Sequence, residues 1–286
     1  MTDSSTKGRA LVLGGGGIAG VAWHVGLLSG LAAEGVDVRE ADTIVGTSAG
    51  SVAGTLLRTH PDLQALYAAQ LEPVPDDFPE VSFDGAAFAD LVTAAGQGGG
   101  GEQAVRARLG RLALDAATRS EDFAKSAITI EFGEVDWPAR PLVVTAVDTA
   151  DGAFTLFDAN SGVPFADAVT ASCTVPGVWT PITVGGRRYM DGGMRSATNA
   201  DVATGHDRVL VVAPFAGFGE GVMGPGLAAE VATLRQTAEV HVVLADDAAL
   251  AAFGLNPIDP RIRGAAARAG RAQAAQVLAE VGTFWG

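Results

Sequence analysis

The chain has 286 residues, of which 48% are hydrophobic, so it can form one large domain or two small ones with a substantial core. Its formal net charge of −14 argues against nucleic acid as a partner and against firm electrostatic binding to an anionic membrane. The single cysteine, Cys173, excludes an intramolecular disulfide, and we interpret it as a small buried apolar residue.

The first predicted elements are a disordered tail at residues 1–8, a buried strand at 10–13 and a helix at 18–35. Residues 10–33 carry no charged side chain, which would also suit a signal peptide or a membrane span. The four glycines at 14–17 would break the apolar helix that either of these requires. We therefore expect a strand–loop–helix unit and a cytoplasmic protein.

A second unit follows, with a strand at 43–45 and a helix at 49–59. Strand, helix, strand and helix within so short a stretch predict a mostly parallel sheet with crossover helices. Residues 61–137 differ from this pattern, because they contain an acidic, proline-bearing run at 72–80 and a glycine tract at 96–101. We interpret them as a cap or lid inserted in a single domain spanning 9–286; an ordinary surface connection is the alternative.

The remaining elements are predicted from apolar runs and helical spacing, and no internal repeat is visible. The expected strands are residues 142–147, 154–157, 182–184, 188–190, 209–213 and 241–245, and the expected helices are 102–117, 226–238 and 264–279.

The glycine loop between the first strand and the first helix offers backbone N–H groups at a helix N-terminus, which suits an anion. Residues 15–20 also satisfy the dinucleotide pattern G-x-G-x-x-G. That pattern requires an acidic residue at the end of the second strand, whereas Asp42 stands before it. An oxyanion-binding loop, a nucleotide site in an oxidoreductase and a simple tight turn all remain open at this point.

Ser48 lies in the sequence Gly46-Thr47-Ser48-Ala49-Gly50, between a short strand and a helix of small residues. A G-x-S-x-G turn holds a serine hydroxyl at the tip of a sharp bend, and small neighbours such as Gly46 and Gly50 are what the bend requires. The sequence predicts a nucleophile; a helix N-cap is the alternative.

A base for this serine is harder to find, because no motif surrounds His24, His60, His206 or His241. Asp191 follows a strand-like segment and precedes two glycines that allow a sharp turn. From spacing alone it is either the base or part of an Asp-Gly turn.

Four motifs in the same order resemble those of the patatin-like phospholipases, which are lipid acyl hydrolases with a Ser–Asp dyad. Residues 15–20 are similar to the family's glycine-rich oxyanion loop, 46–50 to its G-x-S-x-G elbow and 191–193 to its D-G-G motif. Residues 171–177 are similar to the stretch that precedes that aspartate, and the resemblance spans about 9–215. It implies an α/β fold, a three-layer α/β/α sandwich with a mostly parallel central sheet.

The resemblance also implies roles for single residues. Ser48 is the expected nucleophile and Asp191 its base, while Gly15, Gly16 and Gly17 form the expected oxyanion hole. The reaction passes through an acyl-enzyme and involves no cofactor and no metal. The expected partner is a lipid or other acyl ester, with transient contact to a membrane or micelle.

One position departs from the family pattern, because Ala19 stands where the family carries Arg or Lys. Without that cation a phospholipid is less favoured as the substrate, and a neutral ester or acylglycerol is more favoured. The departure also leaves open a catalytically silent binding protein on the same scaffold.

Overall fold

The central sheet is the organising element of the structure, a computed structural model that describes residues 8–74, 81–217 and 221–286. Five of its strands are parallel, in the order β3-β2-β1-β7-β8. These strands are β1 Arg9–Leu13, β2 Thr43–Gly46, β3 Leu142–Asp148, β7 Arg208–Ala213 and β8 Glu239–Leu244. The predicted α/β class and the mostly parallel sheet are confirmed.

Three further strands pair in antiparallel fashion around β3. They are β4 Phe154–Phe157, β5 Ile182–Val184 and β6 Arg187–Asp191. On β3, Val144 pairs with Gly46 of β2 and with β4, while Ala146 pairs with Asp191 of β6 and with β4. Because a strand has only two edges, β2 and β6 must share one edge of β3, with their carboxyl ends facing each other.

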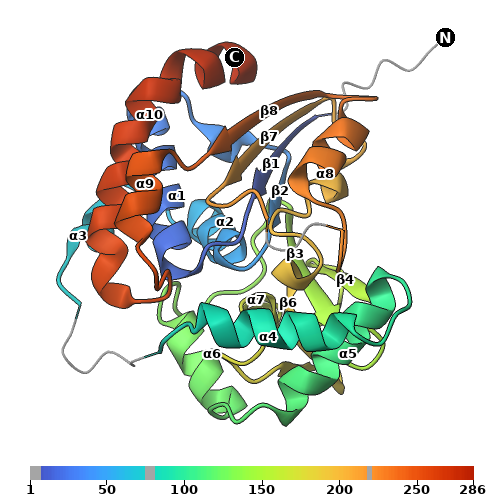
Figure 1. Cartoon of the computed structure of the whole chain (residues 1–286). Coiled ribbons are helices and arrows are strands. Elements are labelled where there is room, and N and C mark those ends of the chain that lie inside the picture. The colour runs from blue at the N-terminus through green and yellow to red at the C-terminus, as the bar shows by residue number, and fades with distance from the viewer. Residues whose placement is uncertain (1–7, 75–80, 218–220) are drawn as a thin grey trace.

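Helices cover both faces of the sheet. Figure 1 shows α9 and α10 on one side, α8 on the other, and α4 and α5 across one end. The longer helices are α1 Gly17–Ala33, α2 Ala49–Thr59, α3 Leu63–Leu71, α4 Gly85–Gly96, α5 Glu102–Asp115, α6 Glu121–Thr129, α7 Phe165–Ser172, α8 Leu227–Leu234, α9 Asp247–Phe253 and α10 Arg263–Trp285. The short helical turns are η1 Val38–Glu40, η2 Gly192–Met194, η3 Ala200–Ala203 and η4 Pro260–Ile262.

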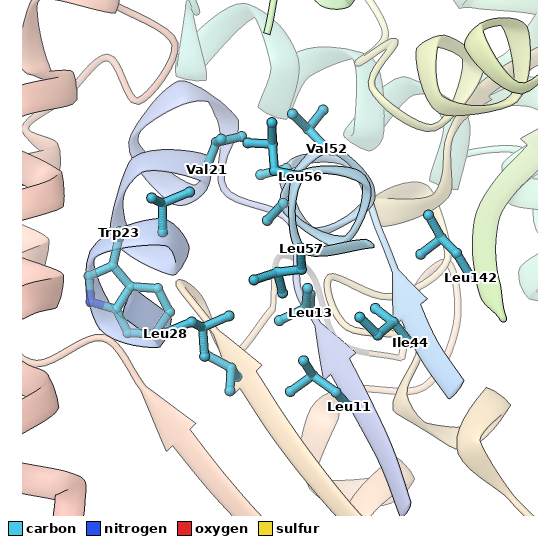
Figure 2. Close-up of a cluster of buried hydrophobic side chains, with 14 of the residues drawn as sticks. Leu11, Leu13, Val21, Trp23, Leu28, Ile44, Val52, Leu56, Leu57 and Leu142 are labelled. Carbon is cyan, nitrogen blue, oxygen red and sulfur yellow. The ribbon is translucent and has the colours of Figure 1, made fainter. Parts of the chain in front are cut away.

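The core lies on both faces of the strands, which explains why the central strands are apolar without alternation. In β1, Leu11 and Leu13 face the layer of α1 and α2, and Val12 faces the layer of η3 and α8. Figure 2 shows the first of these layers, where Leu28 and Leu57 fill the space above the strands. Each such side chain, when fully buried, contributes about 1.5–3 kcal/mol.

The helices α1 and α10 pack with their backbones almost in contact. A Cβ atom added at Gly26 would lie 2.1 Å from the carbonyl oxygen of Ala267, and one at Gly270 would lie 2.3 Å from that of Trp23. The indole Nε1 of Trp23 donates a hydrogen bond of 2.9 Å to Oε1 of Gln273 on α10. This contact anchors α1, whose first residues line the same cavity as Ser48.

Most predicted elements are found with shifted ends. The final helix continues to Trp285 instead of ending at 279, and the helix expected at 226–238 ends at Leu234 because the chain must turn before β8. The tail expected at 1–8 and the acidic run at 72–80 lie largely outside the described residues.

The segment 61–137 holds α3, α4, α5 and α6, where the sequence predicted only the third of these. Its movement as a lid stays a prediction. No helix in the described part of the chain is both long and apolar enough to cross a bilayer.

Candidate active site

Ser48 stands at the turn between β2 and α2 in a backbone conformation that is unusual for any residue except glycine. Its φ is 52° and its ψ is −119°, and such a conformation costs about 1–3 kcal/mol. A Cβ atom at Gly46 would lie 2.5 Å from Cα of Ser51, and one at Gly50 would lie 1.9 Å from the carbonyl oxygen of Leu13. Both glycines are therefore required by space, as the elbow pattern predicts.

Asp191 is the last residue of β6 and is 1% exposed. Its Oδ1 accepts a 2.7 Å hydrogen bond from the backbone N–H of Gly193, while Oδ2 accepts none from the residues that the structure describes. Burial raises the pKa of Asp191 to about 7, although the nearby Ser48 side chain and the Gly193 N–H oppose the rise. A carboxylate with this pKa can accept a proton near neutral pH far better than an exposed one.

The pairing on β3 explains why these two residues, so distant in sequence, lie together. Gly46 pairs with Val144, and Asp191 pairs with Ala146 on the same edge of β3. The carboxyl ends of β2 and β6 therefore meet, and Ser48 and Asp191 line one common cavity.

A polar network holds the two strand ends beside this cavity. The Nδ2 amide of Asn199 lies 3.0 Å from Thr47 Oγ1 and 3.1 Å from the carbonyl oxygen of Gly192, the residues adjoining Ser48 and Asp191. Thr47 Oγ1 also lies 2.9 Å from Thr145 Oγ1 on β3. We did not predict this network, because its members are joined only by the folded topology and follow no spacing pattern.

The glycine loop joins β1 to α1 and passes beside Ser48, since a Cβ atom at Gly15 would lie 3.3 Å from Cβ of Ser48. The backbone N–H of Gly15 donates a 2.8 Å hydrogen bond to the carbonyl oxygen of Ala197, so this predicted donor is already occupied. No acceptor in the described part of the chain takes the N–H of Gly16 or Gly17. Gly17 has a φ of 62°, which glycine adopts readily. The loop thus offers two of the three expected donors.

The common cavity has a volume of about 360 Å³. Its floor consists of residues 15–17, Ser48 and Asp191, and its helical wall includes Phe88 of α4 and Ile128 of α6. No Lys or Arg stands among the described residues that line it. Ala19, the position of the family's cation, is fully buried in the core and brings no charge to the site.

The other nucleophile that lines the cavity is the thiol of Cys173. Burial, and then the charge of Asp191, raise the pKa of this thiol, so it stays protonated and poorly reactive. The side chain packs against the core but is only partly buried, whereas the sequence predicted a buried residue.

The histidines lie elsewhere. None of the four lines the cavity; His24 is fully buried, and burial lowers its pKa to about 4. His206 lies against Thr43, with its Nε2 at 3.0 Å from the hydroxyl oxygen. A histidine base for Ser48 therefore has no candidate here.

A dinucleotide site would use an acidic residue beside the glycine loop, and a metal site would use a cluster of metal-binding side chains. Asp42 accepts a 2.7 Å hydrogen bond from the backbone N–H of Arg9, at the end of β2 opposite to the glycine loop. Within the described ranges, no three His, Cys, Asp or Glu side chains are grouped as metal ligands would be.

Comparison with known proteins gives one match to a family model, that of the patatin-like phospholipases, over residues 11–204. This match covers more than half of the chain and includes the elbow and the D-G-G motif. None of the curated proteins matches the chain.

Two similar solved structures belong to bacterial effectors. VipD from Legionella pneumophila is 12% identical with a TM-score of 0.47, and the alignment covers 96% of this chain and 67% of VipD. ExoU from Pseudomonas aeruginosa, solved with SpcU, is 14% identical with a TM-score of 0.41, over 97% of this chain and 52% of ExoU. The chain thus spans between half and two thirds of their length, and these low similarities transfer no activity or partner.

Proposed function

The chain belongs to the patatin-like phospholipase family, and from that premise we propose that it is a serine acyl hydrolase of uncharged lipid esters. The observation that carries the proposal is that Ser48 and Asp191 line the same cavity, where the carboxyl ends of β2 and β6 meet on β3.

In the acylation step, Asp191 takes the hydroxyl proton of Ser48 while Ser48 Oγ attacks the ester carbonyl. The backbone N–H groups of Gly16 and Gly17 stabilise the oxyanion of the tetrahedral intermediate. A positioned base contributes about 10²–10⁴-fold in rate, and one oxyanion donor contributes about 10²–10³-fold. The intermediate then collapses, and the leaving alcohol takes the proton from Asp191.

In the deacylation step, Asp191 takes a proton from water as the water attacks the acyl-serine. Collapse of the second intermediate releases the carboxylic acid and returns the proton to Ser48 Oγ. Gly15 has a supporting role in this scheme: a Cβ at its position would lie 3.3 Å from Cβ of Ser48, so glycine leaves space beside the nucleophile.

The lining of the cavity favours an uncharged substrate. A phosphate group buried there would meet no lysine or arginine among the described lining residues, and it would lie near the acidic Asp191. Contact with a membrane or micelle would be apolar and transient, because Leu255 at the cavity is 99% exposed while the chain carries a charge of −14.

Labelling with a fluorophosphonate, combined with hydrolysis of p-nitrophenyl octanoate, tests the proposal. We expect the wild type to be labelled and active, and Ser48→Ala to lose labelling and to lose activity by about 10⁴-fold or more. His206→Ala is the control, because His206 lies away from the cavity, and it should remain active. Undiminished hydrolysis by Ser48→Ala would refute the proposal, and a melting-temperature shift with NAD would support the nucleotide alternative.

A further inference from the structure

Glu131 is an ionisable residue of the helical wall for which the proposed reaction has no use. It follows the end of α6, lines the cavity, and its side chain is only 11% exposed. The lining residues of α6 that precede it, Ala127 and Ile128, are apolar.

The carboxylate of Glu131 accepts no hydrogen bond from the residues that the structure describes. The nearest cation is Arg263, whose Nη2 lies 4.0 Å from Glu131 Oε2, which is too far for a hydrogen bond. Arg263 has another partner, because its Nε donates to Oε1 of Gln70 at 3.3 Å. Burial raises the pKa of Glu131, and the charge of Arg263 opposes the rise.

A carboxyl group that is 11% exposed in a cavity wall, and to which no described residue donates, takes its hydrogen bonds from whatever fills the cavity, which points to a ligand that supplies a donor. A cationic ligand group would be repelled by Arg263, which already balances the charge of Glu131. An anionic group would be repelled by Glu131 itself. An uncharged hydroxyl group satisfies the carboxyl oxygens without either repulsion.

We propose that Glu131 binds a hydroxyl group of the substrate, so that the preferred esters are hydroxylated. The hydroxyl group belongs either to the alcohol portion, as in a partial glyceride, or to the acyl chain, as in a hydroxyacyl ester. This inference rests on the proposed hydrolase function and narrows its substrate class.

Two matched substrate pairs test the inference and distinguish the two sources. Glycerol 1-monooctanoate is compared with propyl octanoate, and ethyl 8-hydroxyoctanoate with ethyl octanoate. We expect the wild-type kcat/KM to favour the hydroxylated ester by about 10- to 100-fold in one of the two pairs, as for a hydrogen bond to a charged group. The pair that shows this preference identifies the portion of the substrate that carries the hydroxyl group. Glu131→Leu should remove this preference while changing kcat/KM for the plain ester by no more than about threefold.

Two further variants separate the role of Glu131 from general effects. Glu131→Gln keeps an acceptor oxygen and should keep part of the preference. Glu134→Leu, which removes an exposed carboxylate outside the cavity lining, should keep all of it. The absence of any preference in the wild type, or an equal loss for both members of a pair in Glu131→Leu, would overturn the inference.

Binding without hydrolysis keeps this test separate from that of the function. In the Ser48→Ala background, calorimetry should show 1-O-octylglycerol binding about tenfold or more tightly than octyl propyl ether, unless Glu131 is also replaced. This difference is expected if the recognised hydroxyl group belongs to the alcohol portion of the ester. If it belongs to the acyl chain, the corresponding comparison is between 8-hydroxyoctanoic acid amide and octanamide. If plain esters are hydrolysed through Ser48 and no hydroxyl preference appears in rate or binding, this inference fails while the function stands. If nothing is hydrolysed but Glu131-dependent binding is seen, the function fails instead.

Discussion

Asp191 ends β6 and Ser48 follows the end of β2 by two residues, and both strands are fixed by backbone pairs on β3, whereas the helical wall around Phe88 and Ile128 is held by side-chain packing. A shift of one residue in the register of β2 or of β6 on β3 would move Ser48 or Asp191 relative to the other, so this floor tolerates little change. A side chain in the wall can be replaced with only local effects. The difference teaches that one cavity combines a floor fixed by backbone pairing with a wall fixed by side-chain packing; under the proposed function, these parts would carry reaction chemistry and substrate choice separately.

After Ser48→Ala, the largest effect is expected from Asp191→Asn, which keeps the shape of the floor and removes the proposed base. We expect kcat to fall by about 10²–10⁴-fold, the contribution of a positioned general base. The measurement is steady-state hydrolysis of p-nitrophenyl octanoate. A variant that turned over at nearly the wild-type rate would show that the strand-end geometry serves another purpose.

The pH dependence of activity tests the same residue without mutation. Asp191 must be ionised to accept a proton, and burial raises its pKa to about 7, so kcat/KM should rise with pH and level off above about 7. Below that value the rate should fall about tenfold for each pH unit. A profile that stayed flat between pH 5 and 8 would contradict a buried aspartate base.

Replacement of Asn199 should give an intermediate effect, because this residue positions the floor without touching the substrate. We expect Asn199→Gly to lower kcat by about 10- to 100-fold with little change in KM, since its amide no longer links Thr47 to Gly192. Glycine retains the left-handed backbone, with its φ of 49°, so the loss would not arise from backbone strain. Fluorophosphonate labelling should slow in parallel; unchanged labelling would assign Asn199 a purely structural role.

The smallest effect is expected in the wall. Phe88→Ala enlarges the cavity beside α4, and should change the ratio of kcat/KM between long and short acyl chains by roughly 2- to 10-fold. The rate for a short p-nitrophenyl ester should stay close to that of the wild type. Leu156→Ala, at an exposed position outside the lining, is the matched control. If Phe88→Ala lowered kcat/KM equally for long and short esters, the floor and the wall would not have separate roles.

Local chemistry accounts for what could be predicted from sequence. The apolar strands, the glycines around Ser48 and the D-G-G turn each leave a short signal, because strand burial and sharp bends restrict nearby residue types. The family resemblance, confirmed by the matching family model, supplied the order of these parts.

The remainder could not be predicted, since it depends on partners distant in sequence. The amide of Asn199 and the carboxyl group of Glu131 acquire their surroundings only when separate helices and loops come together. The occupied N–H of Gly15 is of the same kind, because its acceptor is the carbonyl oxygen of Ala197.

The head-to-head arrangement of β2 and β6 on β3 has a consequence for engineering. Ser48 and Asp191 keep their spacing through neighbouring backbone pairs on β3, and this spacing does not depend on the length of chain that joins them. The helices α4, α5 and α6, which follow the elbow helix α2 in the chain, could therefore be exchanged for those of a homologue, or redesigned, as an interchangeable module. Such chimaeras should differ in substrate selectivity while the arrangement of Ser48 and Asp191 stays unchanged.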